Sequence, residues 1–216
     1  MTTRLDLKDL ERKAYRANFQ DGLWDIYLGL LLVQMAFGPL LFEQGWSPIW
    51  ILLLMAGFVT MVLVGFVAAK KWIITPRLGL VTYSQERQKK KRKLTLVLSL
   101  SALGGVVTLL LSTVAFQLVR NGSLGSWSEA IGLMPFALFL VTAVTVFSLG
   151  AYYMDFTRAY VYGWFYGLAF PLNILLVEML DITIPLVTIL FSTIMVGIGL
   201  YLFIQFVRTH PVPAPQ

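Results

Sequence analysis

Residues 48–69 read PIWILLLMAGFVTMVLVGFVAA, a run of 22 residues that contains no charged side chain. As an α-helix this run would be about 33 Å long, enough to cross the roughly 30 Å of hydrocarbon in a lipid bilayer. Lys70 and Lys71 follow it directly. Because lysine and arginine gather on the cytoplasmic side of membrane spans, the segment predicts a transmembrane helix that ends in the cytoplasm.

The composition of the whole chain has the same character. Hydrophobic residues form 58% of the 216 residues and charged residues only 13%, against roughly 25% charged residues in a typical soluble domain. A soluble domain of this size exposes too much surface to hide so many apolar side chains. The sequence therefore predicts an all-α integral membrane protein with six expected spans: Leu23–Phe42, Pro48–Ala69, Leu94–Val119, Ala130–Met154, Ala159–Leu180 and Ile182–Val207.

The basic residues predict the orientation of this six-helix bundle. Every lysine and arginine except Arg120 falls before span one, between spans two and three, between four and five, or after six. Both termini are therefore expected in the cytoplasm, as in a multi-pass protein of the cell membrane, the inner membrane in a bacterium. Around the transmembrane domain of residues 23–207, the expected cytoplasmic parts are the segment 1–22, the loop 70–93 and the tail 208–216.

The segment 1–22 has the pattern of a short amphipathic helix. One face carries Leu7, Leu10, Ala14 and Ala17, and four cations lie elsewhere around the helix. Such a helix can lie on the cytoplasmic leaflet of the membrane. An alternative interpretation is a basic flank whose role is only to set the topology.

The loop 70–93 is the most charged part of the chain, with nine cations and one acidic residue, Glu86. We name its densest part the 87–93 cluster, which comprises Arg87, Lys89, Lys90, Lys91, Arg92 and Lys93. Near an anionic leaflet, each cation contributes about 1 kcal/mol of attraction. We expect the cluster to contact anionic lipid or, alternatively, an acidic protein partner. No aromatic residue is interleaved with the cations of the 87–93 cluster, as is typical of nucleic-acid readers, so no specific nucleic acid is expected.

Two acidic residues stand at the start of the first expected span, in the stretch NFQDGLWDIYLGLLL of residues 18–32. Asp21 is placed to cap the helix, because a helix N-terminus favours a carboxylate oxygen. Asp25 lies one turn further in, where a charge costs up to about 3 kcal/mol. Either Asp25 stays in the hydrated interface and pairs with an arginine or a helix amide, or it faces the bundle interior in an ion or proton path.

A second polar stripe runs along the fifth expected span and consists of Asp155, Arg158, Tyr162, Tyr166 and Asn173. Spans one and five begin on the same side of the membrane, so Arg158 or Tyr162 is predicted to lie near Asp25. A charge-assisted contact of this kind makes a buried charge tolerable. Alternatively, the tyrosines are ordinary anchors at the membrane interface. The candidate intramembrane polar site comprises Asp21, Asp25, Arg158, Tyr162, Tyr166 and Asn173.

Several residue types that carry enzyme chemistry are missing from the sequence. There is no cysteine, the one histidine is His210 in the tail, and no G-x-S-x-G, H-E-x-x-H or glycine-rich phosphate loop occurs. Asp21 and Asp25 could share a magnesium ion, but a catalytic site needs more ligands than these two. No catalytic residue, metal site or cofactor is therefore predicted.

Small residues line one face of several spans, such as Gly163 with Gly167 on the fifth and Thr188, Ser192 and Gly199 on the sixth. Small faces let helices approach closely in lipid, within one chain or between subunits. The leading hypothesis is a non-enzymatic membrane-embedded subunit or scaffold, with a membrane-protein partner or a second copy of the chain on such a face. Two alternatives stay open: a small secondary transporter that uses the polar site, and a lipid-modifying enzyme that uses Asp21 and Asp25.

Overall fold

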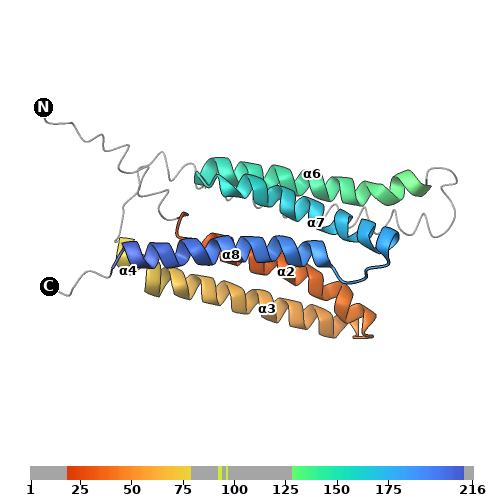
Figure 1. Ribbon diagram of the computed structural model, residues 1–216, viewed down its shortest axis with the longest axis horizontal. Helices are drawn as coiled ribbons and strands as arrows, with labels where there is room; N and C mark the ends of the chain where they lie inside the picture. Colours follow the sequence, from red (N-terminus) through yellow and green to blue (C-terminus); the bar gives the residue numbers. More distant parts are fainter. Residues whose placement is uncertain (1–18, 79–91, 94–95, 97–127, 212–216) are drawn as a thin grey trace, which may run out of the picture. The chain divides into compact units, whose positions relative to one another are not determined.

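The computed structural model describes residues 19–78, 92–93, 96 and 128–211, and this part of the chain contains helices and no strands (Figure 1). Five of its helices are long and apolar enough to cross a membrane. The protein is therefore a helical membrane protein with several spans. The chain divides into two compact units, residues 1–83 with 176–216 and residues 84–175, and each is described by itself.

The first unit contains three long helices: α2 (Leu23–Glu43), α3 (Pro48–Ala69) and α8 (Leu186–Thr209). At its end, α3 continues without a break through a π-helical turn, η1 (Lys70–Ile74), into the short helix α4 (Thr75–Leu78). Pro48 stands in the first turn of α3, where its missing N–H costs no helical hydrogen bond.

Helices α2 and α3 form an antiparallel hairpin. Aromatic rings meet across it, with 4.8 Å between the ring centroids of Trp24 and Phe66. Nearer the turn, Gln34 Nε2 donates a hydrogen bond of 3.2 Å to the carbonyl oxygen of Met55. The long amide side chain of Gln34 is thereby satisfied inside a segment that is otherwise apolar.

The second unit contains α6 (Ser128–Met154) and most of α7 (Arg158–Leu180). A tight turn joins them, in which the N–H of Phe156 donates to the carbonyl of Ala151 at 3.0 Å. Gly163 brings α7 close to α6, because a Cβ at this position would lie only 2.8 Å from the Cβ of Phe147. The small face at Gly163 and Gly167 therefore packs against α6 within the chain.

The helix bounds differ most from the sequence prediction at the sixth expected span. We expected it to begin at Ile182, but α8 begins at Leu186, directly after Pro185 at its N-cap. Proline keeps the residue before it out of the helical conformation, so residues 181–185 stay non-helical. Three predicted features lie wholly or largely outside the described residues: the amphipathic helix of segment 1–22, the span 94–119 and the 87–93 cluster.

Helices α2 and α8 run antiparallel, side by side, and touch backbone to backbone (Figure 1). Gly22 has a φ of +80°, a conformation that suits glycine, and a Cβ there would clash with the carbonyl oxygen of Gly199. A Cβ on Gly199 would lie 2.7 Å from the backbone nitrogen of Ile26 and 2.8 Å from the carbonyl oxygen of Gly22. Two turns along α2, Ser192 Oγ donates to the carbonyl of Gly29 at 2.8 Å. Small residues thus hold these two helices together, as is usual in lipid.

Gly199→Ala should destabilise the protein, because the added methyl group has no room against the backbone of α2. We expect a loss of about 2 kcal/mol, seen as a lower thermal unfolding temperature in detergent. Gly197→Ala is the matched control on the same helix, since a Cβ there would meet nothing within 4 Å. Its stability should stay unchanged or rise slightly. Equal unfolding temperatures for the two variants would contradict the close contact of α2 and α8.

Candidate functional site

An ion pair joins the start of α2 to the end of α3. Lys70 Nζ donates to Asp21 Oδ2, and Asp21 Oδ1 accepts the N–H of Leu23 at 3.0 Å. The Asp21 side chain is fully buried, and that of Lys70 is 17% exposed. Asp21 thus satisfies an amide at the helix start, although the N-cap position itself is Gly22. One end of the first unit is formed by the start of α2, by η1 with α4 and by the end of α8. We name it the Lys70 end.

The π-helical turn η1 sets the direction of the side chains around Lys70. Ile74 is buried in an apolar cluster with residues of α2 and α8, whereas Lys71 is exposed and Trp72 is 74% exposed. A π turn contains one residue more than an α-helical turn, so Lys70 and Ile74 can both face the interior. The hydroxyl of Thr75 donates to the carbonyl of Lys70 at 2.8 Å and stabilises the widened turn.

The charges of the pair depend on each other. Burial raises the pKa of the Asp21 carboxyl above its ordinary value, while the charge of Lys70 and the N–H of Leu23 act in the opposite direction. Removing one partner of a buried pair leaves an uncompensated charge, whereas replacing both partners with apolar groups is often nearly neutral. The pair therefore adds little to the free energy of unfolding. Its main effect is to make any arrangement that separates Asp21 from Lys70 unfavourable, which keeps the start of α2 next to η1.

Asp25 is fully buried one turn into α2. The buried face of the helix continues from it through Gly29, Leu32 and Ala36. The carboxyl therefore points into the protein and is exposed neither to lipid nor to bulk water. Both interpretations of this residue, a carboxylate paired with an arginine or a helix amide and a part of an ion or proton path, stay predictions.

The polar residues of α7 lie in the second unit and pack largely on aromatic rings. Tyr162 is buried, with its ring centroid 6.0 Å from that of Phe156. The guanidinium of Arg158 lies over the same Phe156 ring at 5.1 Å, a cation–π contact. Tyr166 packs on Phe147 of α6 with 4.7 Å between ring centroids. These contacts hold the start of α7 against the end of α6.

The structure thus groups the predicted site residues by unit. Asp21 and Asp25 belong to the first unit, and the stripe of α7 that includes Arg158, Tyr162 and Asn173 belongs to the second. The contact of Asp25 with Arg158 or Tyr162 therefore stays a prediction.

Sequence reasoning missed Lys70 as the partner of Asp21. A signal for it was present, because only EQGWS separates the expected spans one and two, which must then be neighbouring and antiparallel. Asp21 directly precedes the first of these spans and Lys70 directly follows the second. The two side chains therefore lie at the same end of one hairpin.

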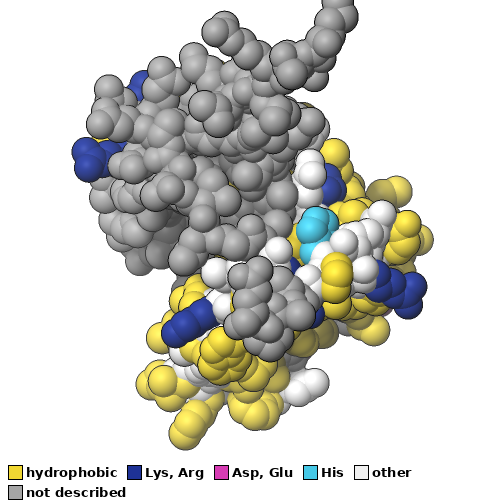
Figure 2. Space-filling model, turned by 90° about the vertical axis from the view of Figure 1, so that its left-hand side faces the viewer, with side chains coloured by type: hydrophobic (Ala, Val, Ile, Leu, Met, Phe, Trp, Pro, Cys, Tyr) yellow, Lys and Arg dark blue, Asp and Glu magenta, His cyan; other side chains and the backbone are white. Residues whose placement is uncertain are grey.

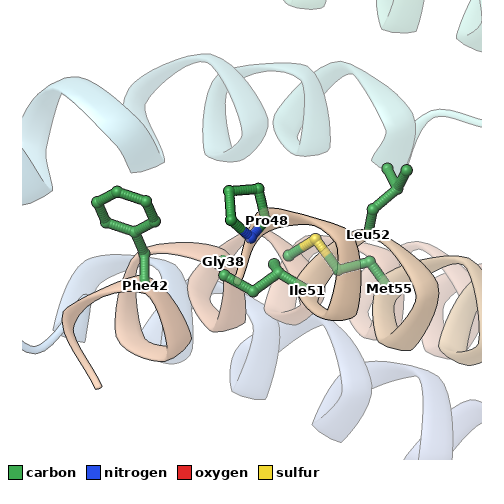
Figure 3. A pocket seen from close by; sticks show the side chains of 6 residues that line it. All are labelled: Gly38, Phe42, Pro48, Ile51, Leu52 and Met55. Atoms are coloured by element: carbon green, nitrogen blue, oxygen red, sulfur yellow. The ribbon is translucent and has the colours of Figure 1, made fainter. Parts of the chain in front are cut away.

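Near the other end of the first unit, α2 and α3 border an open hollow of about 420 Å³ (Figure 3). Its lining is entirely apolar apart from backbone and consists of Gly38, Phe42, Pro48, Ile51, Leu52 and Met55. Such a lining offers few polar groups that could orient a solute. Within the described ranges, no group of three or more His, Cys, Asp or Glu side chains could hold a metal ion.

No protein-family model matches the sequence, and no curated protein or solved structure matches it either. The functional interpretation therefore rests on the geometry of the chain itself.

The buried pair is tested by a double-mutant cycle of Asp21→Asn and Lys70→Met. Each single change should lower the free energy of unfolding by about 3 kcal/mol. This is the low end of the range for breaking a buried ion pair, because the Lys70 side chain is partly exposed. The double variant should be much closer to the original chain, because it leaves no unpaired charge. Unfolding in mixed detergent micelles measures all four proteins. Losses that simply add in the double variant would contradict a direct ion pair.

Proposed function

We propose that the protein is a non-enzymatic, membrane-embedded subunit or scaffold, whose Lys70 end faces the cytoplasm and contacts anionic lipid or an acidic partner. The observation that carries this proposal is the closed contact of α2 with α8. Backbone atoms of Gly22 and Gly199 meet there, and Leu32 and Met195 are both fully buried. This packing leaves no solute path between these two helices and supports a static role for them.

The charge of the Lys70 end supports the contact with anionic lipid or an acidic partner. Lys71 and Arg208 are exposed there, while Asp21 is already paired with Lys70. In the proposed orientation, the 87–93 cluster adds its six cations on the same side of the membrane. The anionic headgroups of a cytoplasmic leaflet attract such a surface. The protein would then belong to the cell membrane, with both termini inside.

The outer face of α3 supports the role of a subunit. Only Ile51 and Val62 of this helix are buried. Large apolar side chains are exposed along much of its length, at Ile49, Trp50, Leu52, Leu53, Met61, Val64 and Val67. Lipid tails or the helix of a partner protein, including a second copy of this chain, can cover such a face.

A secondary transporter is the second candidate, and the burial of Asp25 favours it. Ionisable groups held inside a membrane commonly mark ion or proton routes. In liposomes that contain the purified protein, a pH-sensitive dye would then report proton flux that Asp25→Asn abolishes. The subunit proposal expects no such flux from the original chain or from the variant, so its presence would favour the transporter.

Native mass spectrometry tests the subunit proposal on the protein purified from its host in mild detergent. We expect a stoichiometric partner protein or tightly held anionic lipid, and we expect either to be lost when all cations of the 87–93 cluster are changed to Gln. The matched control changes the cations of the segment 1–22 to Gln, which lowers the net charge similarly. A lone chain without retained lipid, or equal loss in both variants, would contradict the proposal.

A further inference from the structure

The π turn η1 decides which of two neighbouring isoleucines is buried. In an unbroken α-helix, which turns by about 100° per residue, Ile73 would lie within about 20° of Phe66, and Ile74 about 80° away. Phe66 packs on the apolar cluster of Leu23, Ile74 and Phe206, so a regular helix would bury Ile73 there. In the structure Ile74 is the buried one, at 1% exposed, and Ile73 is only partly buried. The extra residue of η1 makes this exchange.

A regular helix would fill the cluster equally well. The side chain that would enter is again an isoleucine, so the same apolar group would be buried. The backbone hydrogen bonds balance too. The N–H of Thr75 donates to the carbonyl of Lys70 across the π turn, and in a regular helix it would donate to that of Lys71. Pro76 has no N–H to donate in either case.

The buried ion pair is compatible with both arrangements. Lys70 is the first residue of η1, so its direction depends little on the extra residue that follows it. It comes four residues after Phe66, which keeps it on the inward side of a regular helix as well. Asp21 can therefore hold Lys70 while the residues beyond it change direction.

Arg77 gives the observed arrangement its advantage. It comes eleven residues after Phe66, so a regular helix would turn it inward, within about 20° of that ring. A guanidinium that faces an apolar cluster is costly. The extra residue of η1 turns Arg77 away from this line, and its Nη1 donates to the carbonyl of Ile73 at 2.7 Å. The two arrangements thus differ mainly in the direction of one charged side chain.

We propose that η1 is a switch between two helical registers. In the observed register, Ile74 fills the cluster. In the second register, Lys70 to Leu78 form a regular α-helix, Ile73 fills the cluster and the extra residue passes into the loop. The end of α4 then turns by about 100° about the helix axis. π turns within α-helices are frequent at functional sites, and two discrete packings of one segment are what a switch requires.

The switch changes the direction in which the basic loop leaves the first unit. The loop that carries the 87–93 cluster begins directly after α4. Figure 2 looks at the Lys70 end and shows Lys and Arg side chains around His210, with no acidic side chain visible on its described residues. The second register starts the loop on another side of the helix and so redirects its cations relative to this basic end. The switch is a property of the first unit and does not rest on the proposed function.

The first test compares the loss of two buried side chains, measured by unfolding in mixed detergent micelles. Leu32→Ala is the control, because Leu32 is fully buried beside the similar Leu31, but α2 has no extra residue with which to shift. It should raise the unfolding equilibrium constant at least about thirtyfold. Ile74→Ala should raise this constant less than about tenfold, because Ile73 takes its place. Equal effects of the two changes would overturn the switch.

Deletion of Trp72 distinguishes a change of register from a site that merely tolerates alanine. The deletion removes the extra residue, so Ile74 comes into line with Phe66 in a regular helix. The shortened chain should fold. Ile74→Ala should now raise its unfolding constant at least about thirtyfold, since Ile73 can no longer replace Ile74. An effect that stays below tenfold in the shortened chain would contradict the proposal.

Spin-label distances measure the second register directly in the full chain. No cysteine is present, so Thr75→Cys and Arg208→Cys, both at exposed positions, introduce the two label sites. A turn of about 100° moves a side chain at position 75 by about 8 Å, given a helix radius of about 5–6 Å. Ile74→Ala should therefore produce a second distance, and the control Ile73→Ala should leave only the original one. An unchanged single distance in the Ile74→Ala protein would overturn the switch.

Discussion

The backbone contact between Gly22 and Gly199 is the constraint on which the rest of the first unit depends. It brings the start of α2 against α8 without a side chain between them. Because Gly22 is held there in a left-handed conformation, the preceding residue, Asp21, is held inside the protein rather than at its surface. A membrane offers no hydrophobic gain for joining apolar helices, so this close fit, with the hydrogen bond from Ser192 to Gly29, is what makes the contact specific.

The other polar features of this end follow from the burial of Asp21. A buried carboxylate requires a cation, which Lys70 provides at the end of α3. For Lys70 and Ile74 both to face inward, the helix widens into the π turn η1, and the hydroxyl of Thr75 and the guanidinium of Arg77 donate to its carbonyls. Each of these groups has its partners except the Nε of Arg77.

The sequence predicts well the five long apolar helices that the structure describes, because the absence of charge over about 20 residues is a strong physical signal. α3 ends at Ala69, where the first lysine follows the apolar run, but the chain stays helical through η1 and α4 to Leu78, in the part that was expected to begin the loop 70–93. The start of α8 was placed too early, because the apolar Ile182 and Ile184 read as helix while Pro185 delays the first turn. The sequence could not decide between the two interpretations of Asp25, since its burial depends on which helix faces pack together. Hydropathy along the chain carries no information about that choice.

The orientation of the Lys70 end is the claim on which the proposed function rests, and site-directed thiol labelling measures it directly. The chain has no cysteine, so His210→Cys, just after α8, and Trp46→Cys, between α2 and α3, each introduce the sole thiol. Both positions are exposed. A membrane-impermeant maleimide should label the Trp46→Cys protein in intact cells. It should label the His210→Cys protein only after the cells are opened. Labelling of the His210 variant in intact cells would contradict the account.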